Sequence, residues 1–137
     1  MAREPERDYS HRTRTQKLGV KPGAVVSVFR LRDDGIRAEL RQAGALVSWG
    51  RLRPSSDIVL LGVHRDADLA ALGRALAVIR QSGGIWVLHP RGREGVQDTT
   101  IFAAGEALGL VSNKVMRFSD TLSGDRLVIP VARRSGS

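Results

Sequence analysis

The sequence contains no cysteine. Disulfide bonds, thiolate metal sites, iron–sulfur clusters and cysteine nucleophiles are therefore excluded. Aromatic residues are also few, with three phenylalanines, two tryptophans and one tyrosine, so no platform for stacking nucleic-acid bases is evident. No apolar run approaches the roughly 18 residues of a membrane-spanning helix, and the charged N-terminus lacks the apolar segment of a secretory signal. We therefore expect a cytoplasmic protein without a membrane partner.

Acidic residues are in the minority. The 22 lysines and arginines exceed the 14 aspartates and glutamates, which gives a net charge of +8, and most of the excess falls in residues 1–53. Such a charge attracts an anionic ligand or an acidic protein surface, and the basic N-terminal part could bind nucleic acid without sequence preference. Most of the cations are arginine, so codon bias in a GC-rich genome is the alternative explanation.

The length of 137 residues fits one domain. Residues 1–16 are polar and show no apolar periodicity, which predicts a flexible basic tail. Residues 17–134 are expected to form a single α/β domain, and residues 135–137 a second flexible end.

Short apolar runs alternate with helical patterns along this domain. The runs predict strands at residues 24–29, 45–49, 57–63 and 85–88. Three helices are expected between or after them: one capped by the aspartates of Asp33-Asp34-Gly35, one capped by Asp66 or Asp68, and one that opens at Asp98. The second should carry an apolar stripe of Leu69, Leu72, Leu76 and Ile79 and end at residues 82–84, and the third should turn Ile101, Ala104, Ala107 and Leu108 inward.

Two final strands, residues 110–118 and 126–131, flank a polar turn at residues 119–125 and should form an antiparallel hairpin. The β-α-β alternation predicts an α/β fold, a three-layer Rossmann-like sandwich whose mostly parallel sheet of about six strands ends in that hairpin. In such folds the carboxyl ends of the strands meet at one edge, where ligands bind.

Several motifs resemble those of a known family. Leu18-Gly-Val-Lys-Pro-Gly23 leads into the first strand, and Ser82-Gly-Gly-Ile-Trp-Val-Leu88 is followed by a proline two residues on. Together with the Ser-Asp-Ile-Val-Leu-Leu strand between them, these segments resemble the actinobacterial domain of unknown function 3052 family over about residues 16–134. They are more distantly similar to class I methyltransferases. The first resemblance implies no established activity.

The methyltransferase resemblance implies a site for S-adenosylmethionine, but two of its features are missing. The loop after the first strand should carry an acidic residue and a Gly-x-Gly, and here it reads Arg30-Leu-Arg-Asp-Asp-Gly35. The second strand should end in an acidic residue for the ribose, and here it ends in Trp49-Gly50-Arg51. We therefore predict a degenerate scaffold without a cofactor, since a fold alone does not carry a function.

His64 and His89 follow the third and fourth strands, with Asp66 and Asp68 nearby. If the rings converge, they could form a proton-transfer pair or hold a metal. Ordinary loop histidines are the alternative, because the spacing matches no metal-binding motif and the aspartates are already explained as helix caps. We predict no metal site.

An anion-binding patch is the alternative use of this edge. Guanidinium groups, mobile glycines and free helical amides suit phosphate or carboxylate groups. The predicted members of the patch are Arg30, Arg32, Arg51, Arg91, Arg93 and Thr99. A solvated arginine-rich surface is the competing interpretation.

These observations favour a non-catalytic binding or regulatory module that recognises an anionic partner. One alternative is a small enzyme whose site is built on His64 and His89. The others are a protein–protein interaction module that uses the edge of the final hairpin and a nonspecific nucleic-acid-binding module. Whether the chain catalyses a reaction stays open at this level.

Overall fold

The computed structural model describes residues 12–92 and 94–134. Its sheet contains six strands in the order β2-β1-β3-β4-β6-β5. The strands are β1 (Val25–Phe29), β2 (Leu46–Trp49), β3 (Ser56–Gly62), β4 (Ile79–Pro90), β5 (Val111–Arg117) and β6 (Leu122–Val128). The first four are parallel, whereas β6 runs antiparallel to β4 and β5. The α/β fold predicted from the sequence is confirmed, including the C-terminal hairpin.

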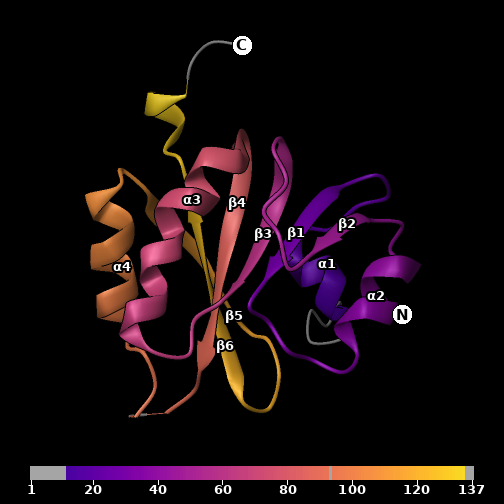
Figure 1. Ribbon diagram of the computed structural model, residues 1–137, viewed down its shortest axis with the longest axis horizontal. Helices are drawn as coiled ribbons and strands as arrows, with labels where there is room; N and C mark the ends of the chain where they lie inside the picture. Colours follow the sequence, from indigo (N-terminus) through magenta and orange to yellow (C-terminus); the bar gives the residue numbers. More distant parts are fainter. Residues whose placement is uncertain (1–11, 93, 135–137) are drawn as a thin grey trace, which may run out of the picture.

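Helices cover both faces of the sheet (Figure 1). They are α1 (Arg14–Leu18), α2 (Ile36–Gln42), the 3-10 helix η2 (Asp66–Ala71), α3 (Leu72–Val78), α4 (Asp98–Ala107) and the 3-10 helix η3 (Val131–Arg133). One apolar core lies beneath α3 and α4 and the other beneath α1 and α2. Residues 58–61 of β3 and 85–88 of β4 are continuous apolar runs because both faces of the sheet are buried there. None of the helices described is long and apolar enough to cross a membrane.

The second predicted helix ends earlier than its pattern suggests. Ile79 was expected on the apolar stripe of that helix, but it has extended backbone angles and begins β4, where it pairs with Ser56. The backbone of β3 also approaches closely, since a Cβ at Gly83 would meet the Asp57 carbonyl oxygen at 2.6 Å. Strand pairing therefore decides the structure of residues 79–84 in place of the helical periodicity. As a result β4 is 12 residues long and extends beyond the strand predicted at residues 85–88 at both ends.

Two further expectations are corrected. Ala107 and Leu108, which were predicted to face inward, are exposed, and Gly105 is buried in their place because α4 approaches Leu127 of β6 there. The strand β6 begins at Leu122 rather than Arg126. Asp125, expected in a turn, therefore pairs with Val87 in the sheet.

The helix α1 begins at Arg14, three residues before the expected start of the domain at Lys17. Thr13 and Gln16 form a capping box at its first turn. Its last turn is fixed to the sheet, because the buried indole of Trp86 donates a hydrogen bond of 3.1 Å to the Leu18 carbonyl. The rest of the predicted N-terminal tail, residues 1–11, and the predicted end at 135–137 lie outside the described residues.

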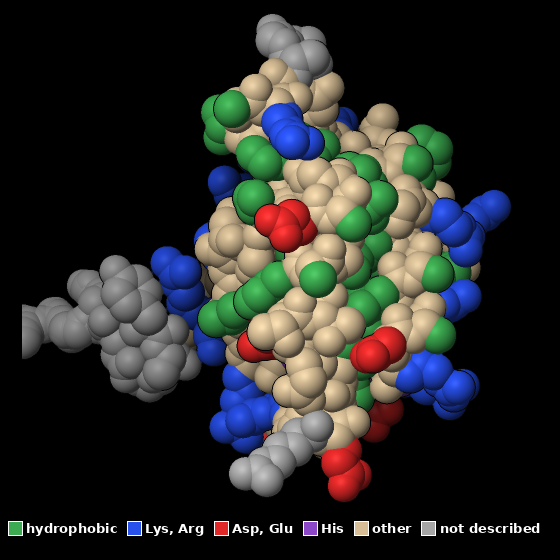
Figure 2. Space-filling model, turned by 90° about the vertical axis from the view of Figure 1, so that its left-hand side faces the viewer, with side chains coloured by type: hydrophobic (Ala, Val, Ile, Leu, Met, Phe, Trp, Pro, Cys, Tyr) green, Lys and Arg blue, Asp and Glu red, His purple; other side chains and the backbone are tan. Residues whose placement is uncertain are grey.

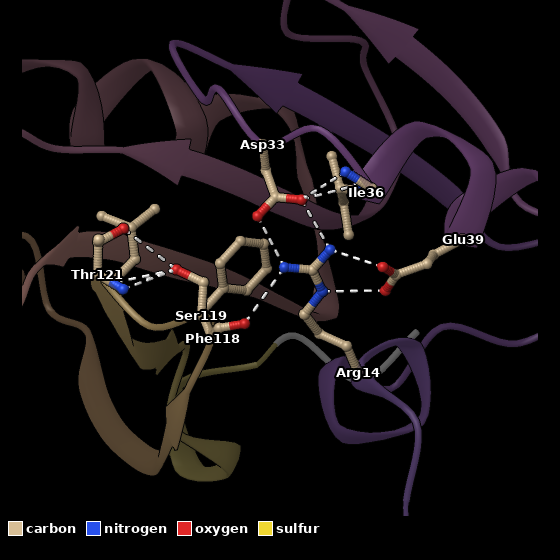
Figure 3. Close-up of polar contacts among 9 residues, drawn as sticks. Arg14, Asp33, Ile36, Glu39, Phe118, Ser119 and Thr121 are labelled. Carbon is tan, nitrogen blue, oxygen red and sulfur yellow. Dashed lines mark hydrogen bonds and ion pairs between the residues drawn. The ribbon is translucent and has the colours of Figure 1, made fainter.

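Arg14 joins three parts of the chain (Figure 3). Its guanidinium donates paired hydrogen bonds to both carboxylate oxygens of Asp33 and to both of Glu39 on α2. It also donates to the Phe118 carbonyl and lies 4.4 Å from the centre of the Phe118 ring. Burial alone would lower the pKa of Arg14, but the two carboxylates outweigh that effect and raise it above its usual value. The α1 end of the chain is thus tied to α2 and to the hairpin.

Candidate functional site

The loop after β1 crosses the carboxyl end of β3. Arg30 has a φ of 60°, and its carbonyl oxygen lies where a Cβ at Gly62 would be, so no larger residue fits there without a backbone shift. Because β1, β2 and β3 are parallel, the loops that follow them lie at one edge of the sheet.

These loops and the start of α2 enclose a hollow of about 500 Å³, which we call the Trp49 hollow. Its lining residues are Val28, Arg30, Leu31, Arg32, Arg37, Trp49, Gly50, His64 and Asp68. The Arg37 guanidinium lies 4.1 Å from the centre of the Trp49 ring, a cation–π geometry that fixes the arginine above the aromatic face.

Positive charge dominates the Trp49 hollow. Three arginines face a single carboxylate, that of Asp68, which lies 3.8 Å from Arg30. Asp68 also accepts hydrogen bonds from the backbone amides of His64 and Arg65. These amides, followed by the nearby arginines, lower the pKa of Asp68 and keep it ionised. Among the described residues Arg32 has no ion-pair partner, so its charge is available to a ligand.

The side chain of Asp33 bonds the backbone at the start of α2. Asp33 accepts hydrogen bonds of 3.0 Å from the amides of Gly35 and Ile36, while Arg14 donates to both of its oxygens. The hydrogen bonds from Arg14 lower the pKa of Asp33. An aspartate of the predicted cap is therefore in place, and it occupies the amides of Gly35 and Ile36.

A second hollow, of about 290 Å³, lies near the end of β4, and we call it the His89 hollow. Its lining residues are His89, Pro90, Arg91, Gly92, Val96, Gln97, Asp98, Thr99 and Ser123. Asp98 is the first residue of α4 rather than its cap. With an imidazole and a carboxylate beside a single described arginine, this hollow lacks the excess of positive charge that an anion site needs.

Behind the His89 hollow lies a buried pair. His89 Nε2 is 2.8 Å from Asp125 Oδ2 and 3.6 Å from Asp98 Oδ1, and the side chains of His89 and Asp125 are only 5% and 2% exposed. Desolvation raises the pKa of Asp98, and the neighbouring Asp125 carboxyl raises it further against the opposing effect of His89.

The structure separates the residues that the sequence grouped together. His64 and His89 line different hollows, so the predicted histidine pair is not assembled. Arg30 and Arg32 line the Trp49 hollow, whereas Arg91 and Thr99 line the His89 hollow. Arg51 is exposed and lines neither of them, and Arg93 lies outside the described residues. The single predicted patch is thus two sites of different character.

Three important residues escaped the sequence analysis. The sequence marked Trp49 only as the end of the second strand, and Arg37 sits on the second position of α2 without a motif around it. Asp125 fell within the polar turn predicted at residues 119–125. Its strand reads Leu-Ser-Gly-Asp-Arg-Leu-Val over Leu122–Val128 and lacks the alternation of apolar and polar residues that marks a strand, so the sequence carries no signal for it.

No protein-family model matches this chain, and none of the curated proteins matches it. Solved methyltransferases share its fold. The 1,6-didemethyltoxoflavin-N1-methyltransferase of Burkholderia thailandensis superposes with a TM-score of 0.62 at 12% identity, over 82% of this chain and 73% of that one. The magnesium protoporphyrin IX methyltransferase of Synechocystis PCC 6803 superposes with a TM-score of 0.60 at 14% identity, over 83% of this chain and 71% of that one. Mitomycin 7-O-methyltransferase superposes with a TM-score of 0.58 at 11% identity, over 80% of this chain and 49% of that one.

The chain therefore has a methyltransferase-like Rossmann fold and spans from about half to about three quarters of the length of these proteins. At such low identity the likeness establishes the fold alone. On the face that carries α4, Figure 2 shows hydrophobic side chains across the middle and basic ones at the margins, so the described residues form no broad basic surface there.

Proposed function

We propose that this protein is a binding or regulatory module on a methyltransferase-like scaffold and that it recognises an anionic partner in the Trp49 hollow. The observation that carries the proposal is the gathering of Arg30, Arg32 and Arg37 around one hollow. Among the described residues that line it, Asp68 is the only carboxylate, and backbone amides already bond it. Guanidinium groups match phosphate and carboxylate oxygens with paired hydrogen bonds.

The hollow suits a small anion or an anionic group of a larger partner. Its volume of about 500 Å³ falls within the usual range for small-ligand pockets. Trp49 and Leu31 supply apolar contact area beside the guanidinium groups. A ligand that combines a negative group with an apolar or planar part would therefore be favoured over a bare ion.

Two contacts support the further proposal that S-adenosylmethionine is not the ligand. Asp33 occupies the amides of Gly35 and Ile36 at the start of α2, where a methyltransferase would offer a glycine-rich turn. Trp49, covered by Arg37, stands where a carboxylate would bind the ribose. The proposal also includes a cytoplasmic location and membership of the domain of unknown function 3052 family, which the motifs over residues 16–134 predict.

Calorimetry with the full chain tests the proposal. The ligand panel is pyrophosphate, a nucleoside triphosphate, an acidic peptide and S-adenosylmethionine. We expect saturable binding of at least one anion that weakens as salt screens the charges, and no binding of S-adenosylmethionine. The double variant Arg32→Ala/Arg37→Ala should weaken anion binding by about 10-fold or more, because each lost charge-assisted hydrogen bond contributes on the order of 1.5 kcal/mol.

Arg41→Ala is the matched control, since Arg41 is an exposed arginine on the same helix that does not line the hollow. It should leave the affinity unchanged. Absence of saturable anion binding, or an equal loss in Arg41→Ala, would contradict the anionic site. Saturable binding of S-adenosylmethionine would overturn the non-catalytic part of the proposal.

A further inference from the structure

Three potential metal ligands from separate parts of the chain meet beside the His89 hollow. They are His89 Nε2 on β4, an oxygen of Asp125 on β6 and an oxygen of Asp98 at the start of α4. All three atoms lie within 4.8 Å of one another. Neither the cluster nor its chemistry depends on anion binding in the Trp49 hollow.

Strand pairing fixes two of the three ligands. In the antiparallel β4–β6 pair Val87 lies opposite Asp125, and His89 lies opposite Ser123. His89 and Val87 share a face of the sheet because they are two residues apart. Asp125 lies on the same face as its partner Val87, beneath α4. The imidazole and the carboxylate are therefore held side by side by the rigid part of the fold.

The carboxylate of this pair is buried and has no lysine or arginine as an ion-pair partner among the described residues. The Asp125 side chain is only 2% exposed. A buried carboxylate is costly unless a cation or several hydrogen bonds compensate it. The Nδ1 atom of His89 is also buried, and it has no hydrogen-bond partner within the part of the chain that the structure describes.

We propose that His89, Asp98 and Asp125 bind a divalent transition-metal ion, of which Zn²⁺ is the best match. Bonds of about 2.0 to 2.2 Å from zinc to nitrogen and oxygen place neighbouring ligands roughly 3 to 3.5 Å apart. The observed separations of 2.8 and 3.6 Å from His89 Nε2 bracket that range. An ion would replace the His89–Asp125 hydrogen bond and neutralise both carboxylates.

The ligand set favours a transition metal over magnesium or calcium, because imidazole is a poor ligand for those harder cations. Three protein ligands also leave a coordination position for water or a small anion. His89 and Asp98 both line the His89 hollow, and the Asp98 side chain is 58% exposed. The metal ion can therefore enter through the His89 hollow, which also has space for a water molecule or a small anion as the fourth ligand.

Calorimetry and Co²⁺ absorption on the full chain test the inference. Metal-free protein should bind one equivalent of Zn²⁺, and Co²⁺ should give d–d absorption bands that Zn²⁺ abolishes. Asp98→Asn should weaken Zn²⁺ binding by about 10-fold or more, as loss of a ligand costs at least what loss of a supporting contact does. Because Asp98 is exposed, this variant should fold normally, which circular dichroism checks. Mg²⁺ should not compete at similar concentrations.

Two control variants exclude adventitious binding. Asp120→Asn removes an almost fully exposed aspartate of the hairpin turn, and His64→Gln removes an exposed histidine of the Trp49 hollow. Both should retain the wild-type affinity for Zn²⁺. If Zn²⁺ does not bind stoichiometrically, or if Asp98→Asn binds it as tightly as the wild type, the cluster is a hydrogen-bonded pair and the metal site is wrong. Either result leaves the test of anion binding unaffected.

Discussion

Arg14 holds Asp33 through two parallel hydrogen bonds of 2.8 and 2.7 Å, although 18 residues separate them along the chain. Asp33 in turn fixes the first amides of α2. Arg14 of α1 therefore helps to orient α2, the helix that supplies Arg37 to the Trp49 hollow. The Asp33 carboxylate thus links the Arg14 ion pair to the proposed binding site.

Arg14→Ala should destabilise the fold by about 2 kcal/mol, because it removes charge-assisted hydrogen bonds and leaves two carboxylates facing each other. Urea unfolding followed by circular dichroism measures the loss. Arg41→Ala, an exposed arginine of α2, should change stability by less than about 0.5 kcal/mol. Equal effects of the two substitutions would show that the Arg14 contacts are not stabilising.

The Asp33 contacts predict a dependence of stability on pH. Its pKa is lower in the folded protein than its ordinary value of 3.8, so its contribution is complete above that value and is lost as the pH falls through the folded pKa. Asp33→Asn keeps an oxygen for the helix amides but loses the charge. It should cost about 1 to 2 kcal/mol at neutral pH.

In Asp33→Asn the free energy of unfolding should differ less between about pH 6 and pH 2.5 than it does in the wild-type protein. Urea titrations at both pH values measure that difference. An unchanged acid sensitivity would mean that other carboxylates, and not Asp33, control it. Asp34→Asn, an exposed neighbour, is the matched control and should preserve the wild-type profile.

Gly62→Ala tests the crossing of the β1 loop over β3. The added methyl group would overlap the Arg30 carbonyl oxygen. Because relief of this overlap requires a backbone shift, we expect the free energy of unfolding to fall by about 2 kcal/mol. Gly73→Ala is the control, since its Cβ meets nothing within 4 Å. Gly73 lies in α3, so alanine should stabilise it by up to about 1 kcal/mol. Thermal unfolding should shift in opposite directions for the two variants.

Trp49 fluorescence reports the charge of its hollow. Iodide should quench it more strongly than caesium, because the surrounding arginines concentrate anions and repel cations. Trp86 is 1% exposed, so the quenching should vanish in Trp49→Phe. Arg32→Ala should reduce quenching by iodide and increase quenching by caesium. Equal quenching by the two ions in the wild-type protein would contradict a basic hollow.

The sequence determined the fold class and the approximate places of the strands. Apolar runs such as residues 57–63 mark strands buried on both faces, and local rules of capping and turns delimit most helices. The sequence prediction was wrong at Ile79, which was placed in a helix. The helical periodicity continues there, but pairing with the neighbouring strand β3 makes the residue part of β4.

For the candidate sites, the sequence supplied Arg30, Arg32, His64 and His89 and their place at the edge of the sheet, because parallel strands bring their carboxyl ends together. Only the tertiary structure decided which of them meet. The register of β4 against β6 places Asp125 beside His89, and the docking of α2 on the sheet brings Arg37 over Trp49. Such contacts depend on residues far apart in the chain, and no local pattern encodes them.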